Sequence, residues 1–127
     1  MRLTKARREI KKIFEINEIP LNADQVYNKL DKEYDLSTIY RNLDFFQKEN
    51  FLKSIVFSDK IKYFYEDIGH FHYIYCVYCK KFEKFDMCYE KNISEYIEKK
   101  LEFEIISHTL YFEGICKECR NKGDKNE

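Results

Sequence analysis

Residues 35–46 read DLSTIYRNLDFF, and residues 51–66 read FLKSIVFSDKIKYFYE. In the first stretch apolar side chains recur every three to four residues, which predicts an amphipathic helix that begins with Ser37 as its N-cap. Asn50 is suited to the left-handed turn that ends such a helix. The second stretch holds two runs of β-branched and aromatic residues around a short polar turn, and this pattern predicts a β-hairpin.

Two more helices are expected before this stretch. Thr4 can cap the first, whose apolar residues follow a helical spacing as far as Asn17. After Pro20, Asn22 with Gln25 three residues later resembles the capping box that opens a second helix. Three helices followed by a hairpin predict a winged helix-turn-helix, in which the third helix can enter a DNA major groove. A helical lobe that packs on a hairpin for another purpose is the alternative interpretation.

The composition is that of a small soluble globular protein. The chain has 127 residues, of which 44% are hydrophobic and 17% aromatic, with three Gly, one Pro and a net charge of zero. These values exclude collagen-like and disordered chains, and no apolar run approaches the roughly 18–20 residues that span a bilayer. The basic N-terminus lacks the apolar stretch of a secretion signal, so a cytoplasmic protein is expected.

The pattern of the chain changes after residue 66. Residues 67–69 are the expected hinge between a winged-helix lobe over residues 1–66 and a second lobe over residues 70–122. Four elements are expected in the second lobe: strands over 71–77 and 81–85, a helix over 89–101 and a strand over 103–112. The charged segment from Lys117 onward is expected to fray, and residues 123–127 are expected to be a disordered tail. The predicted fold class is therefore α+β, with an N-terminal winged helix-turn-helix lobe followed by a small α+β lobe.

Four of the five cysteines form two pairs with the spacing Cys-x-x-Cys. Cys76 and Cys79 make the first pair, and Cys116 and Cys119 make the second. Each pair supplies two thiolates from one tight turn, and two such turns give the tetrahedral sulfur cage that Zn²⁺ prefers. Four thiolates leave no open position for water, so this zinc is expected to be structural. Rubredoxin-like iron and a redox-active pair are the alternatives for the same spacing.

All three histidines fall in the second lobe. His70 and His72 lie two residues apart, which places both rings on one face of a strand, where they could share a metal ion with His108. Histidines that are only hydrogen-bonded are the alternative. The side chains that could complete such a site are those of Glu83, Asp86, Cys88 and Glu90.

Cys88 is the cysteine outside the two pairs, and it is otherwise expected to be a small buried hydrophobic residue. The sequence contains no phosphate-binding loop and no nucleophile with a nearby base. An enzyme is therefore not expected.

Together these segments resemble the ferric uptake regulator family of bacterial metal- and peroxide-sensing repressors. Residues 35–43, DLSTIYRNL, are similar to the family's recognition-helix signature, and residues 22–27, NADQVY, are similar to its second helix. Residues 70–79, HFHYIYCVYC, and residues 108–116, HTLYFEGIC, are similar to its dimerisation lobe. The resemblance covers nearly the whole chain in family order. It implies a homodimer that binds a partly palindromic operator on double-stranded DNA.

The resemblance also implies particular DNA contacts. Tyr40 and Arg41 match residues that contact DNA in the family, and an arginine can fork onto a guanine edge while a tyrosine can contact a thymine methyl group. Ser37 and Thr38, at the start of the helix, are placed to meet the DNA backbone. Basic side chains of the first helix are expected to contact phosphates, with a solvated helix face as the alternative. They are Lys5, Arg8 and Lys12.

For the metal ions, the resemblance places His70, His72 and His108 on ligands of a site inside the dimerisation lobe. Glu90 or Cys88 would supply the fourth ligand. The expected cofactors are thus a structural Zn²⁺ and a second divalent metal, which could be Zn²⁺, Fe²⁺, Mn²⁺ or Ni²⁺.

A further site of the family, at the junction between the lobes, is depleted in this sequence. The family has histidines at the positions of Pro20, Phe71 and Tyr73, and only Glu66 matches a ligand there. A one-residue bulge would instead move the first two histidines of this chain into the junction site. Both alignments are compatible with the sequence.

The sequence thus predicts a metal-dependent transcriptional repressor that acts as a homodimer on DNA. One alternative is a constitutive or redox-sensing DNA-binding regulator in which zinc is purely structural. Another is a zinc-ribbon module that binds protein in place of DNA. Neither a membrane nor a small-molecule substrate is expected as a partner.

Overall fold

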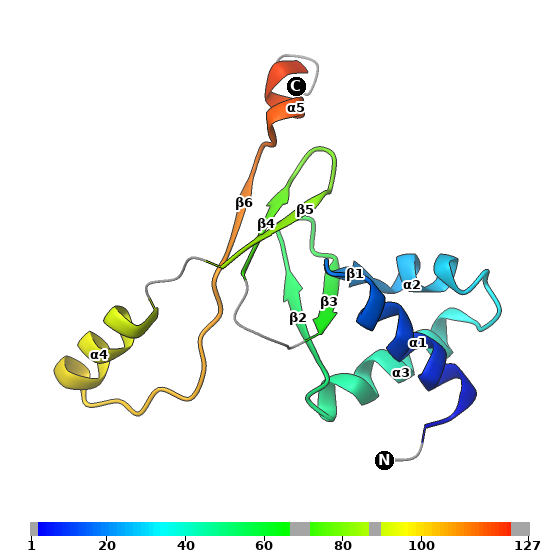
Figure 1. Ribbon diagram of the computed structural model, residues 1–127, viewed down its shortest axis with the longest axis horizontal. Helices are drawn as coiled ribbons and strands as arrows, with labels where there is room; N and C mark the ends of the chain where they lie inside the picture. The colour runs from blue at the N-terminus through cyan, green and yellow to red at the C-terminus, as the bar shows by residue number, and fades with distance from the viewer. Residues whose placement is uncertain (1–2, 67–71, 87–89, 123–127) are drawn as a thin grey trace. The chain divides into compact units, whose positions relative to one another are not determined.

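The structure is a computed structural model that describes residues 3–66, 72–86 and 90–122 (Figure 1). The chain divides into two compact units, Met1–Gly69 and His70–Glu127. The expected hinge at residues 67–69 and the expected tail at residues 123–127 lie outside the described residues. Within the described ranges, none of the helices is both long and apolar enough to cross a bilayer.

The first unit is a winged helix-turn-helix. Its elements, in chain order, are α1 (Lys5–Ile16), β1 (Leu21–Asn22), α2 (Ala23–Lys29), α3 (Leu36–Lys48), β2 (Leu52–Val56) and β3 (Lys62–Glu66). The hairpin of β2 and β3 is joined on its other side by β1, so that an antiparallel sheet of order β1-β3-β2 forms beside the three helices (Figure 1). The predicted succession of three helices and a hairpin is confirmed, and β1 is an addition that the sequence pattern did not indicate.

Local capping signals start the first two helices where the sequence predicts them. The hydroxyl of Thr4 accepts a hydrogen bond from the backbone N–H of Arg7 at 3.2 Å, which caps α1. At α2, the Asn22 side chain accepts from the N–H of Gln25 and the Gln25 side chain accepts from the N–H of Asn22, both at 2.8 Å. This reciprocal pair is the predicted capping box.

The third helix begins two residues earlier than predicted, and Ser37 is not its N-cap. Asp35 is the cap, because its carboxylate accepts the backbone N–H of Thr38 at 2.8 Å and the hydroxyl of Ser37 at 3.0 Å. A carboxylate is a strong acceptor for the free N–H groups of a first turn, and it is also favoured there by the helix dipole. At the other end, Asn50 has the expected left-handed backbone, with φ of 63°.

One hydrophobic core holds the first unit together. It joins the inward faces of the three helices to the sheet, and its buried members are Ile10, Phe14, Leu21, Ala23, Val26, Ile39, Leu43, Phe46, Leu52 and Phe64. Three of these residues come from α3, so burial of this stripe leaves the opposite face of the helix toward solvent.

The second unit is α+β. Its elements are β4 (His72–Cys76), β5 (Phe82–Phe85), α4 (Glu90–Leu101), β6 (Tyr111–Gly114) and α5 (Lys117–Lys122). The sheet has the order β5-β4-β6, with β5 antiparallel and β6 parallel to the central strand (Figure 1).

Two predictions for the second unit are wrong in their boundaries. The strand expected over residues 103–112 starts only at Tyr111, because pairing with β4 begins with Tyr73 opposite Tyr111 and the preceding residues have no strand partner. The segment from Lys117 onward was expected to fray, but residues 117–122 form α5, which buries Cys119. Both corrections reflect tertiary contacts of the second unit.

Candidate metal centre and DNA-facing helix

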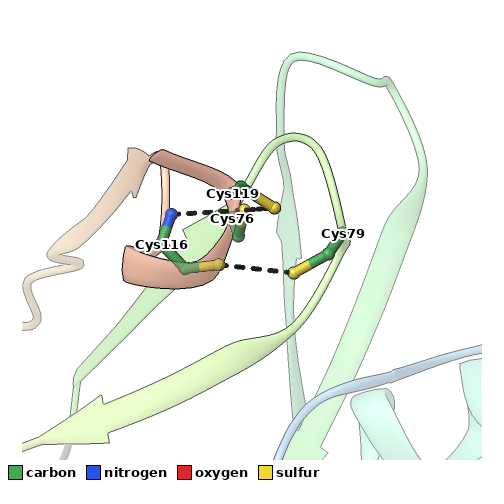
Figure 2. A group of neighbouring side chains, drawn as sticks. All are labelled: Cys76, Cys79, Cys116 and Cys119. Atoms are coloured by element: carbon green, nitrogen blue, oxygen red, sulfur yellow. Dashed lines mark hydrogen bonds between the residues drawn. The ribbon is translucent and has the colours of Figure 1, made fainter. Parts of the chain in front are cut away.

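The four paired cysteines converge at one end of the second unit. Their sulfur atoms all lie within 4.8 Å of one another, with Sγ of Cys76 3.8 Å from Cys119 and Sγ of Cys79 3.7 Å from Cys116 (Figure 2). Among the residues that the structure describes, they are the one group of three or more possible metal ligands that comes together. All four cysteines are free thiols.

These distances fit a tetrahedral metal ion. A Zn–S bond of about 2.3 Å places the four sulfurs of a regular tetrahedron about 3.8 Å apart. The two measured separations match that value, and a disulfide would require about 2.05 Å. The donor set therefore fits zinc, and the four thiols are the residues that would hold it. The predicted four-cysteine group is confirmed.

Each cysteine pair is shaped by its own turn. The first lies on the turn between β4 and β5, where the N–H of Lys80 donates to the carbonyl of Cys76 at 2.9 Å and Lys80 has a left-handed φ of 69°. The second lies at the start of α5, where the N–H of Arg120 donates to the carbonyl of Cys116 at 2.8 Å. The N–H of Cys116 also points to the sulfur of Cys76 at 3.4 Å, which joins the two turns (Figure 2).

The surroundings of the sulfur atoms set their protonation. Burial raises the pKa of the Cys119 thiol to about 12. Burial also raises the pKa of Cys76, but backbone N–H groups of Cys116, Cys79 and Tyr78 outweigh it and lower that pKa to about 6. The backbone N–H groups around Cys76 therefore favour its thiolate, and thiolate is the form that binds a metal.

An ion pair connects the same two turns outside the sulfur cluster. Nζ of Lys81 lies 2.8 Å from Oε1 of Glu118 and 3.5 Å from Oε2 of Glu83. The hydrogen bond from Lys81 lowers the pKa of the Glu118 carboxyl, and the same bond raises the pKa of Lys81. This pair was not predicted from the sequence, although Lys81 lies two residues after the first cysteine pair and Glu118 lies within the second.

Two of the three histidines come together in the second unit. The rings of His72 and His108 have centroids 5.4 Å apart, His72 is only 6% exposed and His108 is exposed. Nδ1 of His72 lies 3.1 Å from the carbonyl oxygen of Leu110. His70 and Cys88 lie outside the described residues, and Glu90 begins α4 with a side chain that is not described.

The predicted DNA-contacting residues of α3 lie on its solvent-facing side. Tyr40 is 54% exposed, and Ser37 and Arg41 are exposed as well, whereas Thr38 is half-buried. Ile39, which lies between them in the sequence, points inward and belongs to the hydrophobic core. The helix therefore offers a hydroxyl, a phenol and a guanidinium on one accessible face.

The basic side chains of α1 divide into two kinds. Lys5, Arg8 and Lys12 are exposed, with Lys5 3.4 Å from Glu33 and Nη1 of Arg8 2.8 Å from the carbonyl of Leu3. Arg7, which was not among the predicted DNA contacts, is half-buried. Contact of Lys5, Arg8 and Lys12 with DNA phosphates remains a prediction.

A comparison with known protein families identifies the family to which this chain belongs. The family model described as "Ferric uptake regulator family" matches residues 1–113. The chain belongs to the ferric uptake regulator family. The regulators of this family are metal- or peroxide-responsive DNA-binding repressors, and the present chain is a transcriptional regulator of that kind. Its relatives in the ferric uptake regulator family are regulators and not enzymes.

Individual family members are distant in sequence but similar over nearly their whole length. The "Peroxide-responsive repressor PerR" of Staphylococcus aureus strain USA300 is 25% identical over 125 residues, which cover 96% of this chain and 84% of that protein. A structure of the Helicobacter pylori ferric uptake regulator, described as having three functional metal-binding sites, superposes with a TM-score of 0.81. It is 26% identical and the match covers 94% of this chain and 83% of the other.

A second solved member of the ferric uptake regulator family contains iron. This Francisella tularensis protein superposes with a TM-score of 0.80 at 26% identity, covering 94% of this chain and 95% of the other. The fold predicted from the sequence is therefore confirmed for both units of the chain.

Proposed function

We propose that this regulator is a metal-dependent repressor that binds a partly palindromic DNA operator as a homodimer in the cytoplasm. The observation that carries the proposal is the third helix of the winged-helix unit, which buries one face in the core and leaves Tyr40 and Arg41 exposed on the other. A helix in this position of a helix-turn-helix enters the major groove.

In the proposed complex, Arg41 reads base edges. Its guanidinium is planar and can donate two parallel hydrogen bonds to O6 and N7 of guanine, while the ring of Tyr40 contacts a thymine methyl group or a phosphate. Ser37 and Thr38 contact the DNA backbone near the N-terminus of α3, where the helix dipole favours a phosphate. Phosphates farther along the duplex are contacted by side chains of α1. These are Lys5, Arg8 and Lys12.

The homodimer is supported by apolar side chains that the single chain leaves uncovered. In α4, Ile93 and Tyr96 are 57% and 62% exposed, and none of residues 91–101 is buried. After this helix, Phe103 and Ile106 are 66% and 89% exposed. Large contiguous apolar surfaces mark interfaces in folded proteins. A second copy that covers this surface would also present a second α3 to the other half of a palindromic operator.

A structural zinc is proposed for the four-cysteine cluster. Zn²⁺ bound there supplies a rigid link between the β4–β5 turn and α5. All four thiolates would coordinate it, so the ion would have no open position for chemistry. Its contribution would be to the folding of the second unit.

The second, regulatory metal is proposed to bind at His72 and His108. The tautomer of His72 that donates from Nδ1 to the carbonyl of Leu110 leaves its lone pair on Nε2, which is the atom that would coordinate the ion. His70 with Cys88 or Glu90 would complete the ligand set. The ion is Zn²⁺, Fe²⁺, Mn²⁺ or Ni²⁺, and its binding would bias the equilibrium between DNA-binding and non-binding arrangements of the two units.

The experiment combines metal analysis with DNA binding. A duplex is selected from a random-sequence pool with the purified protein, and metal per chain is measured by elemental mass spectrometry before and after a mild chelator. The proposal predicts one resistant zinc and one exchangeable metal whose return restores binding. Binding that is unaffected by the chelator would contradict metal dependence and favour a constitutive or redox-sensing regulator, and failure to enrich any sequence would contradict DNA binding.

A substitution tests the DNA-facing helix separately. Arg41→Ala is expected to weaken binding of the selected duplex by about 5–150-fold, the value of one bidentate base contact of about 1–3 kcal/mol. Metal content and oligomeric state should not change. Lys48→Ala is the matched control, because Lys48 is a cation of the same helix but lies at its last turn and 3.1 Å from Asp44. Equal losses in the two variants would contradict base recognition by Arg41.

A further inference from the structure

Arg7 differs from the other basic residues of α1 in its contacts with α3. Lys5, Arg8 and Lys12 are exposed, and Lys11, which is half-buried like Arg7, pairs with Glu15 of its own helix at 3.9 Å. The side chain of Arg7 faces α3 and is held there by two contacts. A cation in the N-terminal segment of a DNA-binding unit is normally available to phosphates, so an inward arginine calls for another role.

Both contacts of Arg7 are made with α3. Nε of Arg7 donates to Oδ1 of Asn42 at 2.9 Å, and the guanidinium lies 3.6 Å from the centre of the Phe45 ring. Asn42 is only 6% exposed, and it is one of two buried polar or charged side chains among the described residues. The planar guanidinium suits this combination of a hydrogen bond and a stacked ring, which a lysine would not reproduce.

The two residues of α3 that Arg7 contacts lie next to the residues that are proposed to face DNA. Asn42 directly follows Arg41. Phe45 lies four residues after Arg41, so the side chains of Arg41 and Phe45 lie on neighbouring turns of the same side of the helix. A rotation of α3 by about 10° would move side chains at a radius of about 5.5 Å by about 1 Å. Base hydrogen bonds tolerate only a few tenths of an ångström, so such a rotation would disrupt recognition.

The residues just before α3 are also tied to α1. The hydroxyl of Tyr34 donates to Oε2 of Glu9 at 3.1 Å, and Tyr34 directly precedes Asp35, the cap of α3. Together with the Arg7 contacts, this bond means that α1 holds α3 at its start and along its length. The hydrogen bond to the Glu9 carboxylate needs the protonated phenol of Tyr34, whose pKa burial and the acceptor raise to about 12.

We propose that Arg7 is a positioning residue for DNA recognition, which fixes the rotation of α3 through Asn42 and Phe45 and makes no phosphate contact of its own. The inference rests on the proposed function, since it assigns a role in DNA binding by α3. It separates Arg7, which orients α3, from the exposed Lys5, Arg8 and Lys12, which attract the DNA backbone.

The salt dependence of binding distinguishes these roles. Each phosphate contact contributes about 0.9 to the slope of log K against log salt concentration. Arg7→Met should weaken binding of the selected duplex about tenfold, as one misplaced base contact would, with an unchanged slope and unchanged affinity for non-specific DNA. Arg8→Met is the matched control and should lower the slope by about 0.9 and weaken both kinds of DNA. Arg7→Lys, which keeps the charge, should behave as Arg7→Met.

Three outcomes would overturn the proposal. The first is a slope of log K against log salt concentration that falls in Arg7→Met as it does in Arg8→Met. The second is an affinity of Arg7→Met for the selected duplex equal to that of the wild-type protein. The third is wild-type affinity in Arg7→Lys. If the wild-type protein enriches no duplex, both the proposed function and this inference are wrong. If the wild-type protein binds a selected duplex and the Arg7→Met variant binds it equally well, only the inference is wrong.

A double variant covers the case in which Arg7→Met does not fold. Replacing both partners of a buried hydrogen bond with apolar groups is close to neutral for stability, so Arg7→Met combined with Asn42→Leu should restore a folded unit by circular dichroism. Because the two residues act on the same rotation, the double variant should lose no more affinity than Asn42→Leu alone. Losses that multiply would show that Arg7 does not act through Asn42.

Discussion

Removing the metal from the four-cysteine cluster should unfold the second unit and leave the first unit folded. The first unit has a core of ten buried side chains between Ile10 and Phe64, and none of the cysteines belongs to it. Among the described residues of the second unit, the buried hydrophobic side chains are those of Tyr73, Tyr75, Cys76, Phe82 and Cys119. Two of these five are themselves ligands of the cluster, so the metal and the core of this unit are lost together.

The magnitude follows from the geometry of the cluster. Two of the sulfur separations, 3.8 and 3.7 Å, match those of a tetrahedral zinc site, and zinc bound by such a site contributes about 10–16 kcal/mol to folding. A whole small domain has a net free energy of unfolding of only about 5–15 kcal/mol. Loss of the ion therefore takes the free energy of unfolding of the second unit to zero or below.

Amide NMR spectra of the reduced protein, recorded before and after a strong chelator, measure this directly. Amides of residues 5–66 should keep their dispersion, and those of residues 72–122 should collapse to random-coil positions and return when zinc is added. The same titration on His108→Ala removes the contribution of the second metal. Dispersed signals from β4 and α5 in protein shown to be metal-free would refute the reasoning, and collapse of both units would refute the independence of the first core.

Three further substitutions test other parts of the molecule. Leu43→Ala, at a fully buried position of α3, should lower the free energy of unfolding of the first unit by about 2–5 kcal/mol in urea titrations. Asp35→Asn should reduce the loss of stability in acid, because hydrogen bonds from Thr38, and then from Ser37, lower the pKa of Asp35 in the folded protein. The stability that the carboxylate contributes is present above the ordinary pKa of about 4 and is lost as the pH falls below it. Urea titrations at pH 3 and pH 6 would detect this difference. His108→Ala should reduce the metal content from two ions to one, with the thiol-bound zinc retained, by elemental mass spectrometry.

Most of the first unit could be predicted because its signals are local. The Asn22–Gln25 box and the Thr4 cap are each complete within four residues, and the structure reproduces both. Residue type alone predicts Ser37 as the cap of α3, because serine is a good cap. Asp35 competes for the same role, and its spacing of three residues to Thr38 was the signal that could have decided between them.

The boundaries of the second unit depend on partners that are distant in the sequence. The aromatic and β-branched residues before Tyr111 read as strand, yet a strand requires a neighbour, and β4 offers one only from Tyr73 to Cys76. The helix α5 is too short for a periodic pattern, and its helical turn brings Cys119 beside Cys76. The cysteine spacing could be interpreted without these details because Cys-x-x-Cys specifies its own turn.

The two units also differ in when they can form during synthesis on the ribosome. The core of the first unit is complete once Phe64 has been added, whereas the cysteine cluster needs Cys119. At about 5–20 residues per second, roughly 3–11 s of translation separate the two events. The nascent chain can therefore carry a folded α3 before its cysteine cluster can form, so metal availability in those seconds acts on the folding of the second unit and not on the formation of α3.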